Sequence, residues 1–233
     1  MIEISNLTKK YNGKMVLNNI SITIKDNQII GLLGQNGCGK TTLLKILAGL
    51  LQDYDGSIKV NGKDLSPDTK AIMNFLPANS SLNQSWSVDK TIRYYSDMFP
   101  SFNEDKARQI ISGFGLDSKE KIKNMSSGMR EKVEIALTMS QKSDIYLLDE
   151  PLGGIDVSIR RKILENIIRN YSDGALMLIS THLISEVETI LDRAIIIKDH
   201  KIYDDISVED IREKHNLSVE EYFVSIFEED YNV

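Results

Sequence analysis

Apolar and polar residues alternate in two stretches near the start of the chain. At residues 2–4 and 20–24, isoleucines are separated by single polar residues. Successive side chains of a strand point to opposite sides, so this period of two predicts strands with one buried face. Asn-Gly at positions 12–13 is a turn signal, and it separates the two predicted strands.

Mostly apolar runs recur further along the chain. They stand at residues 28–33, 72–76, 145–148, 175–180 and 194–197, and shorter strand patterns stand at 57–60 and 201–203. Short runs of this kind are typical of strands buried on both faces. Segments with helical spacing stand at 42–48, 157–170 and 183–191. Strands that alternate with helices predict an α/β fold with a mainly parallel central sheet.

The pattern changes near residue 79. Residues 79–87 are polar and loop-like, and from residue 88 to about 141 the spacing is mostly helical. We therefore expect one domain over residues 1–233, with an N-terminal antiparallel β subdomain and a helical subdomain inserted at about 86–141. The tail, at about 207–228, is predicted to form two short amphipathic helices.

Composition and charge exclude several classes of protein. The formal net charge is −6, so no basic surface points to a nucleic-acid partner. No stretch approaches the roughly 20 apolar residues needed to cross a bilayer, and the first residues lack the pattern of a secretory signal. A single cysteine rules out an internal disulfide and fits a reducing compartment. We expect a cytoplasmic protein.

A glycine-rich motif indicates the class of ligand. Residues 34–41 read Gly-Gln-Asn-Gly-Cys-Gly-Lys-Thr, a complete G-x-x-x-x-G-K-[ST] phosphate-binding loop. The motif follows a predicted buried strand and precedes a predicted helix, so phosphate would lie at a helix N-terminus, where unpaired N–H groups favour anions. Lys40 is placed to reach the β- and γ-phosphates of a nucleotide, and the Thr41 hydroxyl to reach Mg²⁺.

Two carboxylates follow the predicted strand at 145–148. Asp149 stands where open α/β sheets bind ligands, and it can reach the Mg²⁺ that Thr41 also contacts. Glu150 is placed to accept a proton from an attacking water. His182 ends the next predicted strand, where a neutral imidazole can donate to the γ-phosphate or orient that water. Taken singly, Asp-Glu after a strand also fits a solvated turn, and one histidine also fits a structural role.

Together these motifs resemble the ATP-binding subunit of ABC transporters, and the resemblance runs from about residue 2 to residue 226. Tyr11 stands where that family has an aromatic residue that stacks on adenine, although it also fits a surface turn. Met-Ser-Ser-Gly-Met at 125–129 aligns with the family's signature sequence, whose helix would face the γ-phosphate held by a second subunit. Gly-Gly-Ile-Asp at 153–156 matches the loop that couples the two sites of a dimer.

The resemblance implies a P-loop NTPase fold and a dimer that encloses ATP and Mg²⁺. The nucleotide-binding residues that it implies are Tyr11, Gly34, Gln35, Asn36, Gly37, Cys38, Gly39, Lys40, Thr41, Thr42, Ser126, Gly128 and Asp156. The implied catalytic residues are Lys40, Glu150 and His182, and the implied metal ligands are Thr41 and Asp149. The implied partners are a second ABC subunit and separate transmembrane permease subunits, which would hold the chain at the inner face of the cell membrane.

Several positions depart from the family's pattern. Ala78 stands where the family has a Gln, and it can neither bind Mg²⁺ nor position water. Ser127 and Met129 replace a Gly and a Gln of the signature, and Gly153 replaces a Ser. We expect ATP binding to persist, with turnover that is modest or depends on a partner.

Cys38 gives a separate expectation. It lies inside the phosphate loop, beside Lys40 and near a helix N-terminus, and both positive neighbours are expected to lower the pKa of its thiol. This predicts that alkylation blocks ATP binding and that MgATP protects the thiol.

Residues 94–102 and 217–223 resemble segments of antibiotic and multidrug export ATPases of Gram-positive bacteria, although both also fit ordinary amphipathic helices. Permease subunits would dock near residues 78–86 and the helical subdomain. Trp86, Phe99 and Phe102 are candidate contacts there, and each also fits a core position. Two alternatives stay open: a non-transport ABC ATPase that acts as an assembly or scaffold factor, and a regulatory subunit that hydrolyses little ATP.

Overall fold

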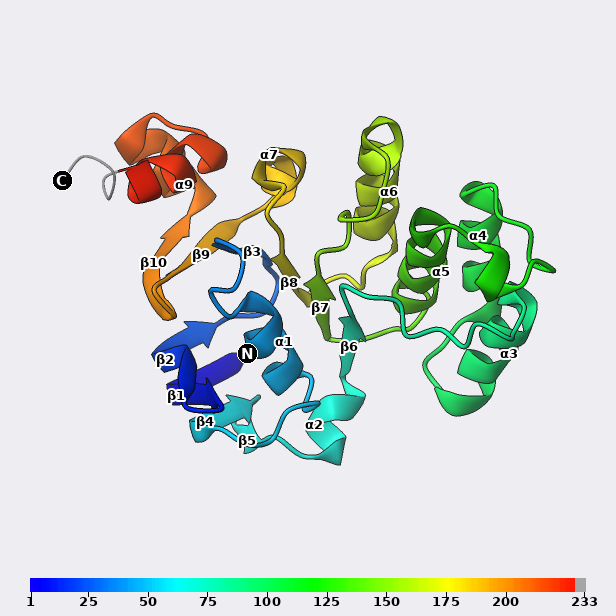
Figure 1. Ribbon diagram of the computed structural model, residues 1–233, viewed down its shortest axis with the longest axis horizontal. Helices are drawn as coiled ribbons and strands as arrows, with labels where there is room; N and C mark the ends of the chain where they lie inside the picture. The colour runs from blue at the N-terminus through cyan, green and yellow to red at the C-terminus, as the bar shows by residue number, and fades with distance from the viewer. Residues whose placement is uncertain (229–233) are drawn as a thin grey trace.

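The protein, in a computed structural model that describes residues 1–228, consists of two β-sheets with helices around them (Figure 1). The smaller sheet is antiparallel, in the order β2-β1-β4-β5, and contains β1 (Ile2–Tyr11), β2 (Lys14–Ile24), β4 (Asp55–Val60) and β5 (Lys63–Asp64). The central sheet has the order β10-β9-β3-β8-β7-β6 and contains β3 (Ile29–Gly34), β6 (Met73–Leu76), β7 (Ile145–Asp149), β8 (Leu176–Ser180), β9 (Arg193–Lys198) and β10 (Lys201–Ser207). Among the strands of residues 1–228, only β9 and β10 pair antiparallel in the central sheet. The predicted α/β fold with a mainly parallel central sheet and an N-terminal antiparallel sheet is confirmed.

The helices fall into groups along the chain. The first two are α1 (Lys40–Leu47) and α2 (Pro67–Ala71). The next three are α3 (Val88–Met98), α4 (Glu104–Gly113) and α5 (Ser127–Met139), and Figure 1 shows them at the end of the molecule away from the antiparallel sheet. The last four are α6 (Val157–Asn170), α7 (Ile184–Val187), α8 (Val208–Asp210) and α9 (Val219–Glu228). In the described part of the chain, no helix is long and apolar enough to cross a membrane.

The continuous apolar strands are explained by two hydrophobic cores. Ile29 and Leu33 of β3 belong to one core, which also contains buried residues of α3, α4, α5 and α6. Ile30 and Leu32 belong to the other, which α1 and the antiparallel sheet share. Successive side chains of a strand point to opposite faces of the sheet. Residues of β3 can therefore pack into both cores only because apolar side chains stand on both of its faces. The central sheet is therefore buried on both faces, and its carboxyl edge carries the polar groups.

The structure contains one helix that the hydrophobic pattern did not predict. α2 has only 5 residues, which is too short for a period to be visible. It begins with a reciprocal cap, because the Ser66 side chain accepts the N–H of Thr69 while the Thr69 hydroxyl accepts the N–H of Ser66. This cap, together with Pro67 in the first turn, was the available signal. The extent of a helical subdomain at 86–141 stays a prediction, although α3, α4 and α5 occupy that segment.

Candidate active site

The carboxyl ends of three central strands meet at one edge of the sheet. β8 pairs in parallel with β3 on one side and with β7 on the other, and Asp149 at the end of β7 lies opposite Ser180 at the end of β8. Gly34 ends β3, so the phosphate loop (residues 34–41) begins at the same edge. Segments far apart in the sequence thus place glycine-rich backbone beside a carboxylate and a hydroxyl.

The phosphate loop turns sharply between β3 and α1. The Cys38 N–H donates to the Gln35 carbonyl oxygen at 3.3 Å, and Gly39 has a φ of +113°. A Cβ atom at Gly39 would stand 2.5 Å from the Val16 carbonyl oxygen, so only glycine fits there. Lys40 then begins α1, and the loop is wrapped around the helix N-terminus. Backbone N–H groups at such an end have no helical acceptor and can donate to phosphate oxygens.

The Lys40 side chain is buried at the loop and is 6 % exposed. Its ammonium donates to the carbonyl oxygens of Gly34 at 2.7 Å and Gln35 at 3.2 Å. Both acceptors are neutral, so the charge of this ammonium is not balanced by a carboxylate in these bonds. A phosphate in the loop would supply that charge, because charge-assisted hydrogen bonds are about twice as strong as neutral ones.

Asp149 is 1 % exposed and forms the centre of the polar edge. Its Oδ1 accepts hydrogen bonds from the Thr41 hydroxyl at 3.0 Å and the Ser180 hydroxyl at 2.6 Å. Its Oδ2 is buried and has no hydrogen-bond partner among residues 1–228. An unpartnered buried carboxylate oxygen is costly, so this atom is suited to a cation.

The donor set at Asp149 fits Mg²⁺ better than a metal that needs an all-protein site. Within the described residues, no three His, Cys, Asp or Glu side chains gather in a way that could hold a metal ion. One carboxylate oxygen and the Thr41 hydroxyl are the protein groups available. Mg²⁺ is commonly held by one or two protein oxygens, while phosphate oxygens and water complete its octahedral shell.

Glu150 and His182 form a polar pair at the mouth of the site. The Glu150 backbone has a φ of +50°, an uncommon conformation for a residue with a side chain. Its N–H donates to the carbonyl oxygen of Ser180 at 3.0 Å, which holds the turn against β8. The Glu150 Oε2 lies 2.8 Å from His182 Nδ1 and accepts the His182 backbone N–H at 3.3 Å. The carboxylate is thus fixed one residue beyond Asp149, with a group that can exchange a proton beside it.

A cavity of 390 Å³ opens over the phosphate loop. Its lining residues are Tyr11, Val16, Asn36, Gly37, Gly39, Lys40, Thr41, Thr42 and Glu150. Tyr11 is 43 % exposed, and the Lys9 ammonium lies 4.9 Å from the centre of its ring. The structure therefore brings Tyr11, the phosphate loop and Glu150 to one cavity, where an aromatic face is available to a flat ring.

Six residues predicted to bind nucleotide do not line this cavity. Gly34, Gln35 and Cys38 belong to the phosphate loop itself, whereas Ser126, Gly128 and Asp156 lie outside it. Ser126 is exposed, and its hydroxyl accepts the Met129 N–H at 3.2 Å, so it caps α5. Asp156 is also exposed and stands at the start of α6, but its side chain makes no capping bond. A role for Ser126, Gly128 and Asp156 in nucleotide binding requires a nucleotide carried by another molecule.

One expectation about the phosphate loop is wrong, and one polar group was missed. Burial raises the pKa of the Cys38 thiol above its ordinary value, and this outweighs the opposing effect of the Lys40 charge. The sequence showed the positive neighbours but not that the thiol is 8 % exposed. The missed group is the Ser180 hydroxyl, which holds Asp149. Its signal was a serine at the end of a strand parallel to the one that carries Asp149.

Comparisons with known proteins show the family of the chain. The family model described as "ABC transporter" matches residues 17–153, which include the phosphate loop, residues 125–129 and Glu150. The ABC transporter ATP-binding protein MJ1023 of Methanocaldococcus jannaschii is 33 % identical over 91 % of this chain and 80 % of its own length. The spermidine/putrescine import ATP-binding protein PotA of Mesoplasma florum is 31 % identical over 95 % of this chain and 66 % of its own length.

A solved structure supports the fold. The structure titled "Structure of ATP binding subunit of ABC transporter" superposes with a TM-score of 0.85 at 24 % identity, and it covers 97 % of this chain and 99 % of that one. Hydrolysis of ATP is the activity expected of proteins in the matched family. The match to the family model and the relative at 33 % identity establish the identity at the level of the family: the chain belongs to the ABC transporter family and is an ATP-binding subunit of it.

Proposed function

We propose that the chain is the energy subunit of a membrane transporter, working as a dimer that binds and hydrolyses two molecules of MgATP. The observation that carries the proposal is the polar edge of the central sheet. There the phosphate loop, the unpartnered Oδ2 of Asp149 and the Glu150–His182 pair lie within one site.

Each group at this edge has a chemical task in the proposed reaction. Bound Mg²⁺, held by Thr41 and Asp149, would neutralise negative charge on the phosphates. Lys40 exchanges its carbonyl acceptors for phosphate oxygens and fixes their position. Glu150 accepts the proton of the attacking water, and His182 holds the Glu150 carboxylate toward the site and contacts the γ-phosphate.

The dimer is proposed because part of the expected site does not line the cavity. Ser126 and Gly128 stand at the N-terminus of α5, which is exposed and suited to bind an anion. In the proposed dimer they contact the γ-phosphate in the partner's loop, and Asp156 lies at the same interface. Hydrolysis removes that phosphate and the two subunits separate, which converts the reaction into movement.

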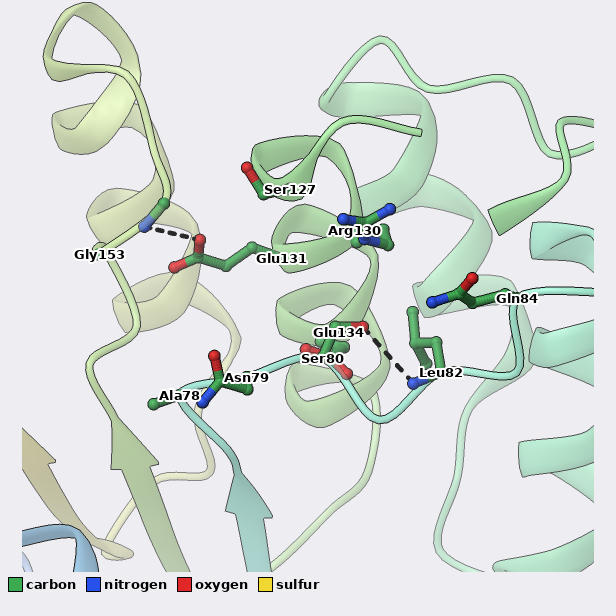
Figure 2. A pocket seen from close by; sticks show the side chains of 11 residues that line it. Ala78, Asn79, Ser80, Leu82, Gln84, Ser127, Arg130, Glu131, Glu134 and Gly153 are labelled. Carbon is green, nitrogen blue, oxygen red and sulfur yellow. Dashed lines mark hydrogen bonds between the residues drawn. The ribbon is translucent and has the colours of Figure 1, made fainter. Parts of the chain in front are cut away.

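The proposed permease contact is a groove between the loop after β6 and α5. This cavity of 440 Å³ is lined by Ala78, Asn79, Ser80, Leu82, Gln84, Ser127, Arg130, Glu131, Glu134, Gly153 and Gly154 (Figure 2). Figure 2 shows polar side chains from both walls around it. Trp86 follows two residues after Gln84 of the groove, its ring lies 4.9 Å from that of Tyr94 on α3, and Tyr94 is 44 % exposed. A groove with an adjacent aromatic face suits a polypeptide segment.

Of the three aromatic residues expected at this contact, Phe102 packs against the core, whereas Phe99 is 37 % exposed. Trp86 is half-buried against Tyr94 and Lys90. The proposed contact therefore rests on Trp86, Phe99 and the additional residue Tyr94.

We also propose that transport is outward, of a peptide antibiotic or drug. The support is the likeness of residues 94–102 and 217–223 to antibiotic and multidrug export ATPases. An import protein, PotA, is also similar to this chain. The direction of transport therefore has to be inferred from the sequence of the membrane partner.

The direct experiment is to tag the chain, solubilise native membranes in mild detergent, and identify the proteins that copurify by mass spectrometry. A polytopic membrane protein in stoichiometric amount is the expected result. A W86A/Y94A double variant that loses this protein while retaining ATP binding would assign the contact. Recovery with soluble proteins alone would contradict the proposal and favour an assembly or scaffold factor.

A further inference from the structure

Glu131 connects two segments that belong to different parts of the proposed reaction. It lies in the first turns of α5, five residues after Ser126, and its Oε2 accepts the Gly154 N–H at 2.9 Å. Gly154 belongs to the post-Glu150 loop (residues 151–155), which leads from the general base to α6. Figure 2 draws this bond across the groove, between α5 and the loop. The helix that would face the partner's nucleotide is thus bonded to the loop that leaves Glu150.

Besides the Glu131 side-chain bond, α5 and the post-Glu150 loop approach each other closely at two glycines. A Cβ atom at Gly128 would stand 2.8 Å from the Gly154 carbonyl oxygen. A Cβ atom at Gly154 would stand 2.4 Å from Glu131 Oε2. Two glycines therefore allow the approach, and a displacement of α5 would displace the loop with it.

The loop is held at both of its ends. The Gly153 N–H donates to the Glu150 carbonyl oxygen at 3.1 Å, which makes a turn directly after the base. On the far side, Arg160 of α6 donates to the Ile155 carbonyl oxygen at 3.0 Å and to Glu186 at 3.2 Å. The bond from Gly154 to Glu131 lies between these two hydrogen bonds. It is the bond through which a movement of α5 would move the loop.

We propose that Glu131 is a positioning residue for ATP hydrolysis, which fixes the post-Glu150 loop against α5 and so sets the placement of Glu150 when a nucleotide docks on α5. This inference rests on the proposed dimer. It assigns a role to a residue that touches neither nucleotide nor metal.

The charges around Glu131 make this bond sensitive to pH. Burial raises the pKa of Glu131 to about 7, and the nearby Glu134 carboxylate also raises it, while the Gly154 N–H and Arg160 lower it. Arg130, the other charged residue of the groove, donates to the Met125 carbonyl oxygen. The loop at 78–84 brings no titratable side chain to the groove. An ionised carboxylate is the stronger acceptor, so the bond to Gly154 is expected to strengthen as pH rises through 7.

The bond is tested directly by the NMR amide signal of Gly154 in the isotope-labelled full chain. In the wild type, its ¹H shift should titrate with a midpoint near pH 7, and in Glu131→Gln that titration should be absent. A Gly154 signal that does not titrate in the wild type, or titrates identically in Glu131→Gln, would overturn the bond. Glu165→Gln is the matched control, because Glu165 is exposed and pairs with Arg161 within one helix.

The positioning role is tested by ATP turnover. Glu131→Ala should lower kcat about tenfold, with KM for ATP within about twofold, because the phosphate loop is unchanged. Glu131→Gln keeps an acceptor for Gly154 and should restore kcat to within about twofold, while the ratio of wild-type to variant kcat rises between pH 6 and 8. Equal kcat in Glu131→Ala and Glu165→Gln would refute the role. A wild type that hydrolyses no ATP would count against the proposed function, whereas the NMR titration would still decide the bond.

Discussion

At the scale of single residues, the buried Oδ2 of Asp149 is the atom of the site that most needs a bound partner. The carboxylate is held by two hydroxyls at Oδ1, and Oδ2 is left for a cation. The same residue shows the limit of sequence reasoning. The motif predicted that Asp149 would lie near Thr41, because both follow strands of a parallel sheet. The motif did not predict Ser180, because Ser180 is not part of it and the sequence alone does not show that β7 and β8 are neighbours in the sheet.

Asp149→Asn should separate metal binding from folding. The amide oxygen can still accept from Thr41 and Ser180, but the amide nitrogen replaces the oxygen suited to Mg²⁺. We expect ATP turnover to fall by about 100-fold or more and to lose its dependence on MgCl₂. Without Mg²⁺, urea unfolding should show that the variant is at least as stable as the wild type, because a neutral amide replaces a buried carboxylate whose Oδ2 has no partner. Wild-type dependence of turnover on MgCl₂ in the variant would refute the assignment.

Cys38 should be an unreactive thiol in the folded protein. Burial raises the pKa of the thiol above its ordinary value, so the thiolate fraction at pH 8 is smaller than in an ordinary cysteine. Alkylation by iodoacetamide should be slower than for a free thiol, and its rate should still be rising at pH 9. The same chain unfolded in urea provides the control and should react quickly. Rapid labelling of the folded protein at pH 7 would contradict this account.

At the scale of elements, the hydrophobic period predicted most strands and long helices because burial decides both. β3, β7 and β8 are continuous apolar runs since both of their faces are covered. Features set by hydrogen bonds rather than by burial were not visible. α2 depends on a capping box, and the turn at Glu150 depends on a positive φ that a strand-ending Asp-Glu does not reveal.

The N-terminus of α5 offers a test in which stability and binding change separately. Ser126 caps the helix, so Ser126→Ala should cost about 1 kcal/mol of unfolding free energy. Ser126→Asp keeps a good cap and should retain the wild-type stability, but it places a negative charge where the partner's γ-phosphate would lie. We expect chemical denaturation to show a stable Ser126→Asp protein whose ATP-dependent dimer, measured by light scattering, is lost. An intact dimer would argue against the proposed contact.

At the scale of the whole molecule, the fold keeps the two halves of the expected site apart. The phosphate loop lies at the carboxyl edge of the central sheet, while Ser126 and Gly128 stand on α5 and do not line its cavity. The family signature predicted this separation only through the resemblance. Composition and periodicity indicate nothing about which surfaces meet in a dimer, because such surfaces are exposed in the single chain.

The pH dependence of the free energy of unfolding should include a contribution from Glu131. Its folded pKa of about 7 lies above the value of 4.5 expected when unfolded, so the folded state binds the proton more tightly. The contribution of this group is complete below about pH 4.5 and is lost as pH rises through 7. Urea midpoints of Glu131→Gln should therefore fall less between pH 5 and pH 8 than those of the wild type. Parallel curves for the two proteins would exclude the raised pKa.

The most direct test of the central claim is phosphate release by the chain purified with its membrane partner, compared with a Glu150→Gln variant of the same complex. The account predicts Mg²⁺-dependent hydrolysis in the wild type and a loss of at least about 100-fold in the variant, with ATP affinity retained because the phosphate loop is unchanged. Equal turnover in both complexes, or no turnover in the wild-type complex, would contradict the claim that this site hydrolyses ATP through Glu150.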